Sequence, residues 1–188
     1  ERDYISIATT RPETMLGDGA VAVHPDDERY RPIVGKLCEI PVGPKESRRL
    51  IPIITDEYPD PTFGSGAVKI TGAHDFNDYE VSKRNGIPLY RLMDNQARMR
   101  EDGEPYAYYA EKAMAIARSG DLPNEAEIDD INLVPDEYRG LDRYEARKRI
   151  VDAIVAEGLA VTVPDAEGVA VPHIENKKIM QPFGDRSG

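Results

Sequence analysis

The sequence predicts a β-rich α+β fold built around a single core. The chain has 188 residues, which is enough for one domain with a sizeable interior. Hydrophobic residues make up 40% and charged residues 31%, an ordinary globular balance. Fifteen glycines and fifteen prolines are scattered among short apolar runs, which favours many short strands joined by turns.

Short alternating or continuous apolar runs predict the strands. Pro52 lies inside one of these runs, and because proline cannot donate to a β-ladder, we expect that position at a sheet edge or a bulge. The expected strands are residues 4–8, 20–23, 37–42, 50–56, 67–71 and 89–93, followed by a hairpin formed by 159–163 and 168–171.

Capping residues and helical spacing predict the helices. Asp75 opens one that runs to about Asn85, and Gly86 stops it. Asp142 opens the last helix, with Tyr144, Ile150, Val151 and Ile154 expected as its buried stripe. The expected helical segments are a turn at 12–17, a short helix beginning at 25–28, and longer helices at 75–85, 106–118 and 143–157.

The stretch 64–83 organises the candidate chemistry. Lys69 and Thr71 lie at the end of a strand, and Asp75 and Asp78 lie in the first turn of the helix that follows. A strand end and a helix start can meet around one small cavity, which would then hold a cation, a hydroxyl and two carboxylates. The competing interpretation is that the two acids only cap the helix.

A second stretch, residues 8–18, places threonines and an arginine where a strand turns into a helical segment. Pro12 suits a first helical position and Gly17 suits its end. Side chains such as Thr10, Arg11 and Thr14, gathered at such a junction, can line a pocket.

Seven motifs follow one another across nearly the whole chain: residues 9–18, 20–30, 66–71, 73–75, 77–81, 140–147 and 184–188. In this order they resemble the editing domain (connective polypeptide 1) of valyl-tRNA synthetase, a class I aminoacyl-tRNA synthetase. Gly19, Gly72 and Phe76 depart from that family's pattern, which usually has threonine at the first position and proline at the other two.

The resemblance implies a closed or nearly closed β-barrel with peripheral helices. It also implies that residues 1–188 form a single editing domain excised from a larger synthetase, with the chain ends side by side. Residues 103–136 are expected to be a peripheral insertion within it. The chain has no His-Ile-Gly-His or Lys-Met-Ser-Lys-Ser motif, so we expect no ATP-dependent aminoacylation by this piece.

The implied reaction is post-transfer editing, the hydrolysis of mischarged Thr-tRNA(Val). Threonine and valine are nearly isosteric, so an apolar synthetic pocket rejects threonine poorly and a second, polar pocket is needed. Without an evident nucleophile–base pair, direct attack by water is expected, with Lys69, Asp75 and Asp78 as the catalytic group. An ion pair between Lys69 and Asp75 would keep both charged.

The resemblance also implies how the substrate is held. Asp78 binds the α-ammonium group, while Lys69, Thr71 and Asp75 read the side-chain hydroxyl or position water. Arg11 and Thr14 hold the terminal adenosine, assisted by Thr10. The alternative is a non-catalytic module that binds the tRNA acceptor end or connects domains.

Composition limits the partners and cofactors. The net charge of −11 argues against a stand-alone nucleic-acid binder, so the expected partners are the aminoacylated 3′ end of tRNA(Val) and the rest of the synthetase in cis. The basic residues Arg143, Arg147, Lys148 and Arg149 are interpreted as a solvated face. The single Cys38, and the absence of a long apolar run, favour a cytoplasmic protein away from membranes. No zinc pattern is present, and we expect neither a metal nor a cofactor.

Overall fold

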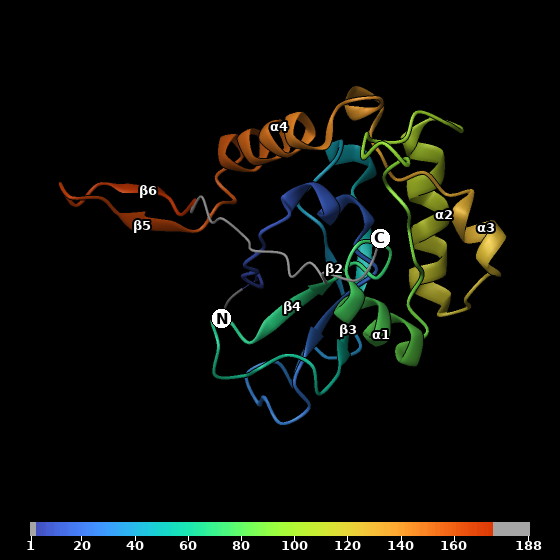
Figure 1. The fold of residues 1–188 in the computed structure, drawn as a ribbon. Coiled ribbons are helices and arrows are strands. Elements are labelled where there is room, and N and C mark those ends of the chain that lie inside the picture. Colours follow the sequence, from blue (N-terminus) through green and yellow to red (C-terminus); the bar gives the residue numbers. More distant parts are fainter. Residues whose placement is uncertain (1–2, 175–188) are drawn as a thin grey trace, which may run out of the picture.

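The structure is a computed structural model that describes residues 3–174, and its centre is a four-stranded sheet (Figure 1). The strands are β1 (Ala20–Val23), β2 (Leu37–Glu39), β3 (Leu50–Thr55) and β4 (Ala67–Ile70), in the order β2-β3-β1-β4. β1 runs parallel to β3, with Val21 opposite Ile53, and antiparallel to β4, with Val21 opposite Lys69. β2 runs antiparallel to β3, with Cys38 opposite Ile51.

The prediction of a closed or nearly closed barrel is wrong for the part of the chain that the structure describes. Closure needs both edges of the sheet to be paired, but β2 and β4 each have one strand neighbour. Residues 4–8 and 89–93, which were expected to add strands, run without a ladder apart from an isolated bridge between Met93 and Met99. The fold is therefore α+β with an open sheet, and the expectation that it is β-rich is wrong, since more of the described residues lie in helices than in strands.

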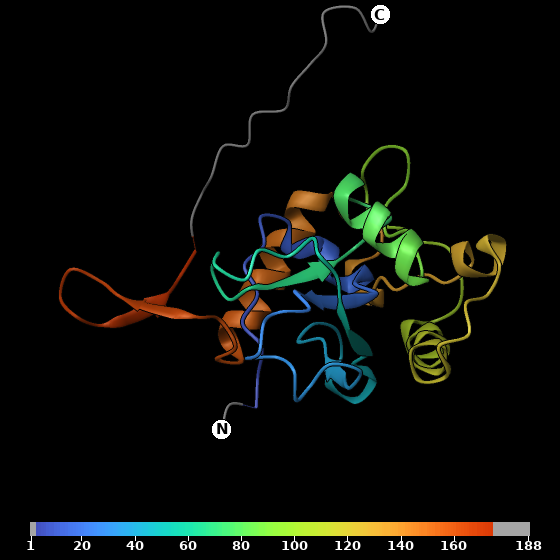
Figure 2. The same ribbon diagram turned by 90° about the horizontal axis from the view of Figure 1, so that it is seen from below.

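Helices and single turns surround this sheet. The 3-10 turns are η1 (Pro12–Gly17), η2 (Lys45–Ser47) and η3 (Asp136–Tyr138), and the α-helices are α1 (Phe76–Asn85), α2 (Tyr106–Ser119), α3 (Glu125–Asp129) and α4 (Arg143–Ala156). A hairpin of β5 (Thr162–Pro164) and β6 (Ala170–Pro172) projects away from the body in both views (Figures 1 and 2). Among residues 3–174, no helix combines the length and the apolar character needed to cross a membrane.

Strand β1 is buried on both faces because a hydrophobic cluster packs against each face of the sheet. Val21 and Val23 belong to the main hydrophobic cluster, which also takes side chains from η1, α2 and α4. Ala20 and Ala22 face a smaller cluster with Val81 of α1, where small side chains let the helix approach closely. This cluster packs α1 against the sheet and so fixes the end of β4 next to the start of α1.

Several local predictions are confirmed. The helix at 75–85 begins after Asp75, whose side chain caps it, and ends at Gly86, which has a left-handed φ of 65°. α2, α4 and the hairpin also form close to the predicted bounds. The expectation that Pro52 lies at a sheet edge or a bulge is wrong, because β3 lies between β2 and β1. Pro52 pairs only with Leu37 of β2, since the pairing with β1 starts at Ile53. Its missing N–H is therefore not needed by β1.

Two other local predictions are wrong. Residues 25–35 form consecutive turns instead of a short helix. Tyr144, expected in the buried stripe of α4, is 58% exposed. The buried residues of this helix are Ala146 and Ile150.

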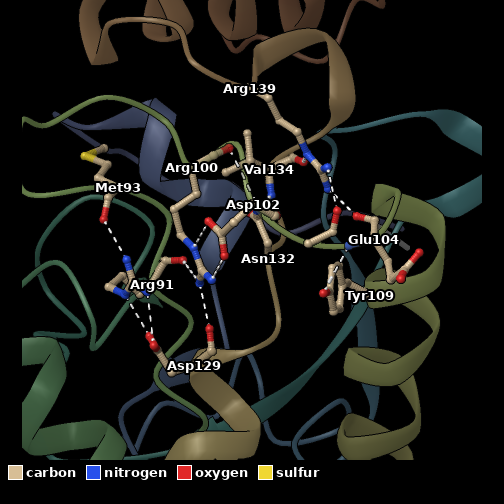
Figure 3. A network of polar contacts seen from close by, with 11 residues as sticks. Arg91, Met93, Arg100, Asp102, Glu104, Tyr109, Asp129, Asn132, Val134 and Arg139 are labelled. Atoms are coloured by element: carbon tan, nitrogen blue, oxygen red, sulfur yellow. Dashed lines mark hydrogen bonds and ion pairs between the residues drawn. The ribbon is translucent and has the colours of Figure 1, made fainter.

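Residues 103–136 contribute directly to the main cluster, through Tyr109, Ala113, Ile128, Ile131, Leu133 and Val134. A polar network also fixes them to the preceding loop (Figure 3). The buried guanidinium of Arg100 donates to the carbonyl of Asp129 at 2.8 Å, and Asn132 donates to the carbonyl of Asp102 at 2.7 Å. That the segment is an insertion stays a prediction. The expected meeting of the chain ends concerns residues outside those described.

Candidate active site

Lys69 is the centre of the candidate site. Strand alternation puts Ile70 toward α1 and Lys69 on the opposite face, beside η1. Its ammonium donates to the hydroxyl of Thr14 at 3.0 Å, to the hydroxyl of Thr71 at 2.5 Å and to the carboxylate of Asp18 at 3.2 Å. An ammonium group has three N–H donors. All three donors of this buried lysine are therefore in use.

Asp18 is a site residue that the sequence reasoning missed. It is almost fully buried, and it accepts hydrogen bonds from both Lys69 and the hydroxyl of Thr71. Burial raises the pKa of this carboxyl to about 6, although Lys69 beside it acts in the opposite direction. A lysine within an apolar strand requires a buried counterion. This requirement is the signal in the sequence that could have led to Asp18. The ion pair expected between Lys69 and Asp75 is replaced by one between Lys69 and Asp18.

Asp75 and Asp78 have different roles in the fold. The exposed Asp75 accepts the N–H groups of Asn77 at 2.8 Å and of Asp78 at 3.1 Å, and so caps α1. Asp78 is buried, and its Oδ2 accepts the N–H of Thr71 at 2.9 Å. Burial also raises the pKa of Asp78. Asp78 therefore joins the first turn of α1 to the end of β4.

Arg11 connects the threonine-rich turn to the start of α1. Its guanidinium donates to the carbonyl of His74 at 2.5 Å, and its own carbonyl accepts the hydroxyl of Thr14 at 2.9 Å. Thr9, one residue before the predicted Thr10, accepts the N–H of Arg11 at 3.0 Å. Thr10 is exposed, and within the described part of the chain it forms no hydrogen bond with the other candidates.

His74 orders the turn between β4 and α1, as the sequence predicted. Its Nε2 accepts the backbone N–H of Leu92 at 2.9 Å. Burial, followed by the positive charge of Arg11, lowers the pKa of His74 to about 4. The imidazole is therefore neutral at pH 7 and acts as an acceptor.

The thiol of Cys38 lies near this cluster but is not activated. Burial, followed by the negative charge of Asp18, raises the pKa of Cys38 to about 11. The thiol is thus protonated at neutral pH and is a poor nucleophile. Among residues 3–174, no three His, Cys, Asp or Glu side chains lie where they could hold a metal ion together.

Six of the seven candidate residues thus belong to one continuous hydrogen-bonded group: Arg11, Thr14, Lys69, Thr71, Asp75 and Asp78. Two clefts lie elsewhere. One of about 220 Å³ is lined by Arg91, Arg98 and Arg100 among others, and one of about 340 Å³ by Asp56, Glu57 and Arg84 among others. The site is a buried polar cluster with the exposed Asp75 at its rim. The catalytic and binding roles of its residues stay predictions.

Comparison with solved structures defines the class of fold. The structure titled "The crystal structure of GlLeuRS-CP1" matches this chain with a TM-score of 0.50 and 14% sequence identity. The match covers 81% of this chain and 80% of that one. The fold is therefore of the type found in the CP1 domain of class I synthetases. No family model matches the sequence.

The sequence identifies the family more closely. A valine--tRNA ligase from Ruegeria pomeroyi is 70% identical over 202 aligned residues, which include 100% of this chain and 20% of the relative. The chain belongs to the valine--tRNA ligase family and spans about one fifth of the length of this relative. The resemblance seen in the sequence motifs is confirmed.

Proposed function

We propose that this chain is the post-transfer editing domain of a cytoplasmic valine--tRNA ligase and hydrolyses the aminoacyl ester of mischarged Thr-tRNA(Val). Its partners would be the aminoacylated 3′ end of tRNA(Val) and the rest of the ligase in cis. The observation that carries the proposal is the buried polar group around Lys69, which ends at two carboxylates at the start of α1. The family membership supports it.

Asp78 is suited to hold the substrate's α-ammonium group. Its Oδ2 accepts the N–H of Thr71, and within residues 3–174 its Oδ1 accepts no hydrogen bond. A carboxylate with one fixed and one available oxygen can bind a cation in a set direction, and such charge-assisted bonds are strong. The bound ammonium would in turn favour the ionised form of Asp78.

Asp75 and Arg11 would act on either side of the ester. One oxygen of Asp75 accepts both capping N–H groups, which leaves the other at the exposed rim to position water or the threonine hydroxyl. Arg11 uses one terminal nitrogen on His74 and keeps the second for the terminal nucleotide. Thr10 is exposed beside it and is available to the same nucleotide.

Lys69 would contribute mainly by positioning. Because its three donors are engaged, it sets the orientation of the Thr14 and Thr71 hydroxyls, which lie buried beneath the two carboxylates of α1. No activated nucleophile accompanies these groups in the described residues, so direct attack by water is the step that the site can support.

The test uses a full-length ligase that carries this segment, with hydrolysis of Thr-tRNA(Val) and Val-tRNA(Val) measured separately. Asp78→Asn should reduce threonine-selective hydrolysis by about 10- to 100-fold, the loss expected for one hydrogen bond to a charged group. Asparagine is preferable to alanine, because alanine would leave the buried N–H of Thr71 without an acceptor.

Aminoacylation with valine should be unchanged, and Asp60→Asn, an exposed carboxylate in the β3–β4 loop, serves as the control. Wild-type hydrolysis by Asp78→Asn would remove this residue from the site. If the wild-type ligase hydrolyses neither substrate, the non-catalytic acceptor-end or interdomain module becomes the better interpretation.

A further inference from the structure

One side of α4 presents a basic and aromatic surface. Arg143 and Arg147 are four residues apart, as are Tyr144 and Lys148, so the four side chains share one side of the helix. We call these four residues the α4 basic face. Tyr144 is 58% exposed, whereas Ala146 and Ile150 are the buried residues of this helix.

Two cations of this face have no carboxylate partner. The guanidinium of Arg143 lies 4.7 Å from the centre of the Tyr144 ring and donates to its hydroxyl at 3.0 Å. Lys148 is exposed, and among residues 3–174 neither it nor Arg143 forms an ion pair. By contrast, Arg149 on the next side of the helix is paired with Glu145 at 2.9 Å.

The α4 basic face is connected directly to the candidate active site. Arg147 makes a two-point contact with the carboxylate of Glu13, at 2.8 and 2.9 Å. Glu13 is fully buried in η1, and its carboxylate also lies 3.7 Å from the guanidinium of Arg11. α4 crosses directly over η1 (Figure 1). Arg11, Glu13 and Arg147 therefore form a chain of alternating charges from the candidate site to α4. Arg143 and Arg147 both lie over the ring of Tyr144, at 4.7 and 5.4 Å from its centre, which brings this chain to the α4 basic face.

We propose that the α4 basic face binds the single-stranded 3′ end of the RNA whose terminal ester is hydrolysed at the candidate site. Arg143 and Lys148 contact phosphates, and Tyr144 stacks on a base. Cations next to an exposed aromatic ring are the groups that bind single-stranded nucleic acid without sequence preference. This inference rests on the proposed function, since it names the surface that carries the substrate's RNA.

The connection to the site favours RNA over a protein partner. A phosphodiester chain leading from the bound terminal nucleotide must leave the candidate site over some neighbouring surface. In an acidic chain, the surface that repels it least is the one with unpaired cations. The alternative occupant is another part of the ligase, and the experiment separates the two.

The experiment uses the full-length ligase and a threonine-charged acceptor-stem minihelix with a single-stranded 3′ end. Hydrolysis is measured between 50 and 200 mM KCl for the double variant Arg143→Gln/Lys148→Gln. We expect KM to rise about tenfold with kcat unchanged, and the slope of log(kcat/KM) against log[KCl] to fall in magnitude by about 1.4, which corresponds to two phosphate contacts on a single strand. Tyr144→Ala should raise KM by about 5- to 150-fold and leave the salt slope unchanged.

The chain provides a matched control in α2. Tyr108 and Lys112 have the same spacing on that helix, with Tyr108 48% exposed and the Lys112 ammonium 4.6 Å from the ring centre. Tyr108→Ala and Lys112→Gln should leave both KM and the salt slope at wild-type values. Lys148→Arg, which keeps the charge, should behave as wild type.

Equal KM values and equal salt slopes for the α4 and α2 variants would overturn the inference. So would a loss of aminoacylation or thermal stability in the α4 variants without a change of salt slope, because that result would place α4 against the ligase itself. Failure of the proposed function is distinguishable, since the wild-type ligase would then hydrolyse no threonyl ester. In that case the same salt titration, applied to the binding of the uncharged minihelix, still tests the α4 basic face.

Discussion

A lysine inside a buried strand is tolerated only with a counterion and a full set of acceptors. Lys69 meets both conditions through Asp18, Thr14 and Thr71, which come from two segments about fifty residues apart. These contacts tie η1 to β4. The same residues that make the site polar therefore also hold its two halves together.

The Asp18–Lys69 pair should be strongly coupled in stability. Asp18→Asn keeps the shape of the side chain but leaves the buried ammonium without a counterion, and we expect the free energy of unfolding at pH 7 to fall by about 3 kcal/mol or more. Adding Lys69→Met should recover part of that loss, since the uncompensated charge is removed. Denaturant titration of the four members of the cycle measures the coupling.

The exposed pair of Glu145 and Arg149 is the control for this cycle, and its coupling should stay below about 0.5 kcal/mol. Additive effects of Asp18→Asn and Lys69→Met would contradict the role given to the buried pair.

His74 should make the fold sensitive to acid. Its pKa is about 4 in the folded state against an ordinary value of 6.5, so between these values the unfolded chain binds the extra proton. Stability is therefore present above pH 6.5 and is lost as the pH falls toward 4, by up to about 3 kcal/mol. Asp18, with its raised pKa of about 6, acts in the opposite direction over pH 6 to 4 and partly masks the effect.

The measurement is the difference in the free energy of unfolding between wild type and His74→Gln, followed from pH 7.5 to 4.5. Other titrating groups contribute nearly equally to both proteins and largely cancel in this difference. A difference that does not change with pH would show that His74 keeps an ordinary pKa.

The junction between β4 and α1 is the element that aims the two carboxylates. Gly72 lies in it. A Cβ at this position would lie 2.3 Å from the hydroxyl of Ser82 and 2.5 Å from a methyl of Leu89. The glycine thus permits α1 to pack closely against the turn, and close packing sets the distance between Thr71 and Asp78.

Gly72→Ala should lower the free energy of unfolding by about 1–3 kcal/mol, because the added methyl group overpacks this junction. Ser82→Ala should recover part of the loss in the double variant, since the nearest clashing atom is removed, while the contacts with Leu89 at 2.5 Å and with the Cβ of residue 82 at 2.8 Å remain. Chemical denaturation of the single and double variants tests both statements.

Gly86→Ala is the comparison at the other end of α1. It has open space for a Cβ but a φ of 65°, so it should cost only about 1 kcal/mol through its backbone conformation. A loss after Gly72→Ala no larger than this, with no recovery by Ser82→Ala, would rule out close packing as the reason for the glycine.

At the scale of the whole molecule, an open sheet needs its core covered by other elements. Here α2 and the segment 128–134 cover one side, together with α4 and η1. The hairpin of β5 and β6 contributes no residue to either cluster. Residues 103–136 and the hairpin therefore differ in what they contribute to stability, although both lie outside the sheet.

Replacing residues 107–135 by a short Gly-Ser linker tests the predicted insertion. The linker can be short because the N–H of Tyr106 already donates to Asp136 at 3.3 Å. We expect the shortened chain to lose its cooperative unfolding transition, since six buried side chains of the main cluster are removed.

Removal of the β5–β6 hairpin in the same way is the control and should leave the transition almost unchanged. A shortened chain with wild-type cooperativity would establish that residues 103–136 are peripheral, as the sequence alone suggested.

Local signals in the sequence determined the elements whose ends are set by their own residues. The capping side chain of Asp75, Gly86 beyond Asn85 and the apolar run 67–70 are sufficient for β4 and α1, because a cap or an alternating run acts within a few residues. The ordered motifs determined the family, and they identified six of the residues that the fold brings together.

Only the tertiary structure decided the order of the strands, the open edges of the sheet, the counterion of Lys69 and the exposure of Tyr144. Each of these depends on which distant segments pack together. The pairing of Asp18 with Lys69 spans 51 residues, and no local periodicity can select it over Asp75. Long-range packing selects among partners that the local sequence leaves equivalent. In the folded chain Lys69 forms its ion pair with Asp18, and Asp75 caps α1.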